Sequence, residues 1–209
     1  MNKGYKKAFK LIESWRYKYN VEETLRLFIA DWSHKHTKMY PVTNDIVNEQ
    51  AYLDVAIPLS HVLSELMLDD GETDPLAVLL GEFGKSNNAF RAYYPTPDSV
   101  STLISSLLGS ECKSIYEPCA GTGSIIINKV EKLFLENIEK SSPLSNFTFH
   151  AEDVDEVACY GLLIQLVHKL RYLELHYGKP AAPRQFTIQQ VNVLTRQKGK
   201  VYFELLSKN

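Results

Sequence analysis

A glycine turn near the middle of the chain limits what this sequence can fold into more than any other feature. Residues 117–124 read EPCAGTGS, after a short run, residues 113–117, that predicts a strand. Residues 124–138 predict the helix that follows. Gly121 and Gly123 permit positive φ angles and let a ligand approach the backbone closely. The order strand, glycine turn, helix is typical of a turn that binds a phosphate or a nucleoside.

Two common versions of such a turn do not fit. The dinucleotide-binding form has a third glycine where this chain has Ile126. The lysine of the ATP-binding form is also missing. Instead, an acidic residue, Glu117, stands at the end of the strand.

Strands and helices are predicted to alternate around the turn. The predicted strands are 113–117, 147–151, 186–191 and, as a candidate, 201–206; the predicted helices are 99–108, 124–138 and 155–172. This alternation predicts an α/β fold with a parallel sheet.

The first 88 residues predict helices only. Asn20 is a predicted cap with Glu23 in the capping-box position, a long apolar helix runs from about Ile46 to Leu68, and Asp74 starts a shorter one. The polar stretch 84–88 predicts a boundary, giving a helical region, residues 1–88, and a ligand-binding domain, residues 89–209.

Composition argues against several classes of protein. The net charge is −2, so no chain-wide positive field attracts nucleic acid, and the N-terminal lysines are best explained as a solvated helix face. The three cysteines do not have zinc-site spacing, so we expect no metal. With no signal segment, and no apolar run judged long enough to span a bilayer, we expect a cytoplasmic protein without a membrane partner.

Residues 117–123 resemble the first motif of N6-adenine DNA methyltransferases, in its D/E-P-A/C-C/A-G-T-G form. The resemblance implies part of a class I methyltransferase (Rossmann-like) sheet and S-adenosylmethionine as cofactor. It implies that Glu117 holds the methionine ammonium through a charge-assisted hydrogen bond. Pro118, Gly121 and Gly123 complete the cofactor turn.

Two later segments extend the resemblance. The second strand ends in Glu152 and Asp153, where a Rossmann-like fold holds ribose hydroxyls. Asp153 is the predicted ribose ligand, and Glu152 is the alternative if the turn shifts by one residue. Residues 189–194 resemble the family's G-N-S-L segment, which implies that Asn192 faces the cofactor adenine; an ordinary turn asparagine is an equal alternative.

An upstream segment completes the motif order. Residues 90–100, around Tyr94 and Thr96, resemble the Q-F-Y-T-P segment of the gamma group and of type I restriction modification subunits, with an extra proline. In the family this segment lies over the methionine part of the cofactor, with Thr96 the expected contact. The alternative is a proline-rich turn followed by a helix cap.

The part of the family that holds the target adenine is missing from these residues. None of the nine prolines is adjacent to another, so there is no D/N-P-P-Y/F tetrapeptide, and only three or four of seven strands are predicted. We therefore expect a cofactor-binding half domain that cannot methylate DNA alone, with no catalytic residue to assign. It is a fragment, a short relative, or a subunit whose partner chain contacts DNA. Strand 201–206 would expose an apolar edge, which predicts a homodimer or a heteromeric subunit.

Two other functions compete with this interpretation. One is a non-catalytic regulatory or interaction protein that keeps the cofactor fold, in a restriction-modification, phage or mobile-element system. The weaker one is a nucleotide-binding oxidoreductase, which the missing third glycine disfavours.

Overall fold

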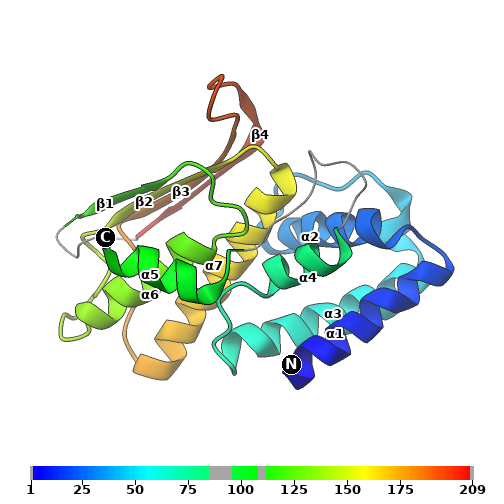
Figure 1. The fold of residues 1–209 in the computed structure, drawn as a ribbon, viewed down its shortest axis with the longest axis horizontal. Helices are drawn as coiled ribbons and strands as arrows, with labels where there is room; N and C mark the ends of the chain where they lie inside the picture. Colours follow the sequence, from blue (N-terminus) through cyan, green and yellow to red (C-terminus); the bar gives the residue numbers. More distant parts are fainter. Residues whose placement is uncertain (1, 85–95, 108–111, 208–209) are drawn as a thin grey trace. The chain divides into compact units, whose positions relative to one another are not determined.

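The computed structural model describes residues 2–84, 96–107 and 112–207. The chain forms two compact units, residues 1–95 and 96–209, coloured blue to cyan and green to red in Figure 1. The predicted boundary after residue 88 falls outside the described residues.

The first unit is helical, as predicted. Its elements are α1 (Lys3–Ser14), the 3-10 turn η1 (Trp15–Tyr17), α2 (Val21–Thr37), η2 (Asp45–Asn48), α3 (Gln50–Leu68) and α4 (Pro75–Phe83). Asn20 caps α2 by accepting from the Glu23 N–H at 3.1 Å, and Asp74 caps α4 by accepting from the Ala77 N–H at 3.0 Å. The predicted Asn20 cap and the predicted start of a shorter helix at Asp74 are therefore confirmed.

The third helix corrects one expectation. By length and composition, α3 is apolar enough to cross a membrane, and it is the one such helix among the described residues. The expectation that no run was long enough was therefore wrong. The core helix of a globular protein meets the same test, and Tyr52, Leu59 and Leu63 on α3 are fully buried.

A buried carboxylate links α2 to α3. Asp31 on α2 accepts hydrogen bonds from the Tyr52 hydroxyl at 3.0 Å and from Lys35 Nζ at 2.7 Å. Tyr52 is fully buried and its ring stacks on Trp15, with centroids 5.8 Å apart. Burial raises the pKa of the Tyr52 hydroxyl, so it stays a donor. The two helices therefore share a satisfied polar contact inside an aromatic core.

The second unit is a four-stranded α/β sheet. Its elements are α5 (Asp98–Leu107), β1 (Ser114–Glu117), α6 (Ser124–Glu136), β2 (Thr148–Asp153), α7 (Glu156–Tyr177), β3 (Gln185–Val191) and β4 (Lys198–Leu206). The strand order is β1-β2-β3-β4, and the first three strands are parallel. α6 connects β1 to β2, and α7 connects β2 to β3. Both connections cross to the next strand in the same direction, so with right-handed crossovers both helices lie on the same face of the sheet, as Figure 1 shows. The structure confirms the predicted partial Rossmann-like fold.

The last strand departs from the parallel prediction. β4 runs antiparallel to β3. Residues 192–197, which connect the two strands, are too few for a parallel crossover, which needs about a dozen residues or more, so a hairpin forms.

Side chains alternate between the two faces of the sheet, apart from an irregularity in β3 between Gln189 and Val191. Phe149, Phe186 and Ile188 are buried on the face that carries the helices. The opposite face carries mainly polar and aromatic residues, namely Tyr116, His150, Glu152, Thr187, Gln189, Tyr202 and Glu204. Parallel sheets covered on both faces are apolar on both. This sheet is therefore built to be covered by helices on one face.

The predicted apolar edge at residues 201–206 is only partly apolar. β4 is an edge strand, but Val201 and Phe203 are buried, and Tyr202 and Glu204 are exposed. Leu206 is an exposed apolar side chain at its end.

We predict that Tyr52→Phe lowers the free energy of unfolding by about 1–2 kcal/mol, because a buried hydrogen bond to a carboxylate is lost. Urea unfolding followed by circular dichroism measures the change. Tyr17→Phe is the matched control, since Tyr17 is 94% exposed. Equal stability of the two variants would contradict a structural role for the Asp31–Tyr52 contact.

Candidate cofactor site

The glycine turn has the backbone that its sequence predicts. β1 ends at Glu117, and Gly121 and Gly123 have φ angles of 57° and 107°. A Cβ atom on Gly123 would lie 2.3 Å from Leu162 Cδ1 of α7. At Gly123 the absent side chain therefore lets the turn pack against α7, in addition to allowing positive φ.

Three hydrogen bonds hold this turn to the neighbouring elements. The Ala120 N–H donates to the Glu152 carbonyl at 2.9 Å, and the Gly121 N–H donates to Asp153 Oδ2 at 2.8 Å. The Gln165 side chain of α7 donates to the Thr122 carbonyl at 2.7 Å. The turn is thus fixed to the end of β2 and to α7.

Asp153 lies beside the glycine turn. Its second oxygen, Oδ1, accepts from the Asp155 N–H at 2.9 Å, which shapes the start of α7. Burial raises the pKa of the Asp153 carboxyl, and the N–H donors of Asp155 and Gly121 oppose that rise. Of the two carboxylates that end β2, Asp153 is the one whose side chain reaches the turn.

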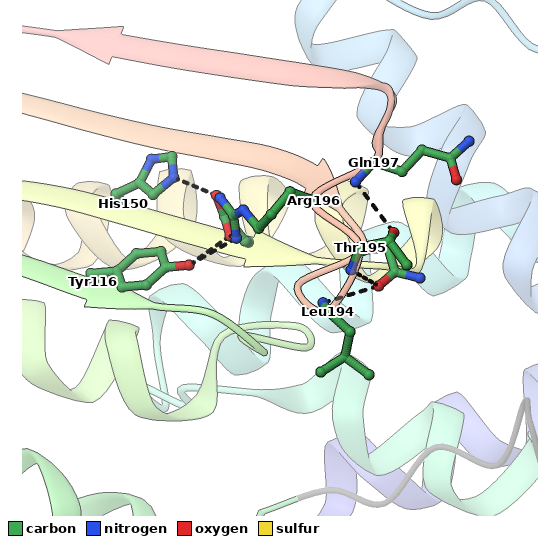
Figure 2. A network of polar contacts seen from close by, with 8 residues as sticks. Tyr116, His150, Leu194, Thr195, Arg196 and Gln197 are labelled. Carbon is green, nitrogen blue, oxygen red and sulfur yellow. Dashed lines mark hydrogen bonds and ion pairs between the residues drawn. The ribbon is translucent and has the colours of Figure 1, made fainter.

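Glu152 lies on the opposite face of the sheet, because adjacent residues of a strand alternate, and it contacts Tyr116, His150 and Arg196, which Figure 2 labels. Arg196 donates to both Glu152 oxygens at 2.7 and 2.8 Å, and the Tyr116 hydroxyl donates at 2.7 Å. His150 Nε2 lies 3.0 Å from Oε1. Glu152 is 2% exposed, and Arg196, the largest influence, lowers its pKa to about 2 although burial opposes this. This carboxylate is occupied within the fold.

The Glu152 network was not found from sequence. Tyr116 and His150 share its face because strands alternate, and their rings lie 5.4 Å apart. Arg196 comes from the β3–β4 connection with a left-handed φ of 58°. It reaches Glu152 only because the strands form a hairpin, and no local pattern indicated a hairpin.

The glycine turn lies in a negative environment. Burial raises the pKa of the Cys119 thiol, and the charges of Asp153, Glu117 and Glu152 raise it further. Cys119 and Pro118 are exposed on the turn, and Glu117 is partly buried. A site with these neighbours favours a cation over a phosphate.

The other predicted site residues, Asn192, Thr96 and Tyr94, are distant in sequence from the glycine turn and from Asp153. The Asn192 side-chain oxygen accepts from the N–H groups of Leu194 and Thr195, each at 3.1 Å, and so caps the hairpin turn. This is the behaviour of a turn asparagine. Thr96 is partly buried just before α5, and Tyr94 lies outside the described residues.

We predict that Arg196→Ala destabilises the protein most above pH 4.5, the ordinary pKa of a glutamate. Because the folded-state pKa of Glu152 is lowered to about 2, its ionic contribution is complete above 4.5 and is lost as pH falls towards 2. Urea unfolding at several pH values should show the gap between parent and variant closing on acidification. Lys200→Ala, which breaks an exposed pair with Glu156, should have little effect at neutral pH. A gap that does not change with pH would contradict the prediction.

Comparison with known proteins identifies this part of the chain. Residues 74–168 match the model of the N-6 DNA methylase family, a stretch that contains the glycine turn, Glu152 and Asp153 and ends before β3. Searches of curated proteins and of solved structures gave no match. Over residues 74–168 the chain is therefore similar to the N-6 DNA methylase family, which supports the resemblance seen at the glycine turn.

Proposed function

We propose that the second unit binds S-adenosylmethionine at the carboxyl ends of β1 and β2. The observation that carries this proposal is the pair of carboxylates, Glu117 and Asp153, beside a turn with two positive-φ glycines. The cofactor carries an ammonium and a sulfonium, and it supplies an electrophilic methyl group when bound. Its positive charges suit the negative environment of the turn.

In this proposal Glu117 accepts a charge-assisted hydrogen bond from the methionine ammonium. Asp153 accepts from the ribose hydroxyls and keeps its bond to Gly121. A carboxylate has about four acceptor positions, so the N–H donors of Gly121, Asp155 and Val154 leave room for a hydroxyl. Pro118, Gly121 and Gly123 shape the turn.

The remaining contacts are assigned by the family resemblance. Thr96, with Tyr94, is proposed to cover the methionine part of the cofactor, and Asn192 to face the adenine. The Asn192 oxygen is engaged in the hairpin turn, so its NH2 group would make that contact.

We further propose that these 209 residues do not methylate DNA alone. An adenine acceptor has to be flipped out, stacked on an aromatic ring and oriented through its amino group. The family's D/N-P-P-Y/F tetrapeptide does this, and the sequence contains no adjacent prolines. Contact with DNA would then come through a partner chain.

The alternative, a non-catalytic regulatory protein with the same fold, is favoured by one observation. Glu152 and Asn192 were both considered as ligand residues from the sequence, yet the Glu152 carboxylate and the Asn192 oxygen are engaged in contacts within the fold. Cofactor binding separates the two functions.

We predict that Glu117→Gln weakens S-adenosylmethionine binding about 10- to 100-fold, because a charge-assisted hydrogen bond contributes about 1.5–3 kcal/mol. Isothermal titration calorimetry with S-adenosylmethionine and S-adenosylhomocysteine measures the affinity. Glu139→Gln, on the exposed α6–β2 connection, is the matched control and should bind like the parent. Equal binding by both variants would contradict the assignment of Glu117, and no binding by the parent would favour the non-catalytic alternative.

We predict no transfer of radiolabelled methyl groups to duplex DNA by the purified 209-residue protein. A complete N-6 DNA methylase serves as the positive control. Methylation above background would contradict the proposed incompetence and leave the cofactor proposal standing.

A further inference from the structure

Positive charge is concentrated at the start of the chain. Residues 1–18 contain six lysines and arginines and one acidic residue, whereas residues 19–209 contain 17 lysines and arginines and 24 acidic residues. The first 18 residues therefore carry a net charge of +5 and the rest of the chain carries −7, although the whole chain has a net charge of only −2. The small net charge of the chain conceals this separation.

One exposed face of α1 consists of lysines. The residues of this face, which we call the lysine face, are Lys3, Lys6, Lys7 and Lys10. Their spacing of three and four residues places them on the same side of the helix. The other side of α1 is buried and packs against α3, which lies beside it in Figure 1. α1 is therefore fixed in the helical unit with its lysines turned outward.

The carboxylates near the lysine face bind other groups. Asp70 and Glu72, which follow α3, accept hydrogen bonds from the neutral side chains of Asn2 and Tyr5, at 2.9 and 3.2 Å. The two other basic residues among the first 18 are each paired with a glutamate. No lysine of the face forms an ion pair with a carboxylate in the part of the chain that the structure describes. Four positive charges thus remain for a partner.

The charges of α1 oppose its helix dipole. The first turn of a helix is positive and favours acidic residues, and the last turn favours basic ones. α1 begins with Lys3 and Lys6, and it has no acidic residue in its first turn and no basic residue in its last. α2 and α7 follow the usual rule at both ends. Lys3 and Lys7 add a repulsion between like charges four residues apart. Charges that weaken their own helix indicate a surface that serves binding rather than stability.

We propose that the lysine face binds the phosphate backbone of duplex DNA. A helix rises about 1.5 Å per residue, so Lys3 and Lys10 are about 10 Å apart along the axis of α1. Each DNA strand has one phosphate per about 3.4 Å of the duplex axis, so the face spans about three phosphates of one strand. Such contacts hold the duplex in place without reading its sequence.

Two observations favour DNA over an anionic membrane. A helix that lies on a membrane inserts an apolar face into it. The apolar residues of α1, among them Tyr5, Ala8 and Ile12, are buried in the helical unit instead. Residues 74–168 are also similar to a family of DNA methylases. The choice of DNA as partner therefore rests on the proposed function, whereas the contact itself does not need the cofactor site. It is additional to the partner chain proposed above, and it gives the lysines a role beyond that of a solvated face.

Fluorescence anisotropy of a labelled duplex of about 20 base pairs, in the absence of S-adenosylmethionine, tests the proposal. The parent should bind at low salt, and its affinity should fall steeply as the salt concentration rises. Replacing three lysines of the face should weaken binding at low salt by about 10-fold or more and reduce the salt slope by about 3, because each phosphate contact contributes about 0.9. The substitutions are Lys3→Gln, Lys7→Gln and Lys10→Gln.

A second triple variant is the matched control. It makes the same change in net charge at exposed lysines outside α1, namely Lys38→Gln, Lys113→Gln and Lys198→Gln, and it should bind like the parent. Glutamine and lysine have similar helix propensities, and the substitutions in α1 remove repulsion. The α1 variant should therefore melt at the temperature of the parent or above, so that lost binding is not lost folding.

Several results would overturn the proposal. They are no binding by the parent at low salt, equal weakening in the two triple variants, or unchanged affinity and salt slope in the α1 variant. Binding of the parent to phosphatidylserine-containing vesicles in place of DNA would also overturn it. If the parent binds DNA through α1 but does not bind S-adenosylmethionine, the cofactor proposal fails and the DNA contact stands.

Discussion

The hydrogen bond from the Gly121 N–H to the Asp153 carboxylate is the contact on which the second unit depends. It joins the turn after β1 to the turn after β2, and the other Asp153 oxygen shapes the start of α7. The bond joins a glycine with a left-handed φ to the carboxylate of the last residue of β2. One interaction thus sets the relative position of two strand ends, where a nucleoside-binding fold places its ligand.

Alternation along the strands explains why Asp153 and Glu152 have different environments. Adjacent residues of a strand point to opposite faces, so Asp153 meets the glycine turn and Glu152 meets Arg196. The Glu152 pair also holds the β3–β4 connection against β2, behind the candidate cofactor site. The polar face is therefore stabilised by charge-assisted contacts, and the opposite face by apolar packing on α7.

Features set by local chemistry were predictable from sequence, and those set by distant residues were not. The Asn20 and Asp74 caps and the positive φ of Gly121 follow from residue type and its immediate neighbours. The direction of β4 depends on how the chain turns after Asn192, and the Arg196 contact depends on that direction in turn. Asn192 matches the family pattern for a ligand residue, and its side-chain oxygen caps the hairpin turn. Residue type alone could not separate these two roles, because asparagine suits both.

β1 links the Glu152 contacts to the candidate cofactor site. The Tyr116 hydroxyl donates to Glu152, and the next residue, Glu117, begins the cofactor turn. β1 has only four residues and is paired on one side, so β2 and the glycine turn supply most of its order. The position of Glu117 therefore depends mainly on β2 and the glycine turn, whatever the chemistry carried out at the turn.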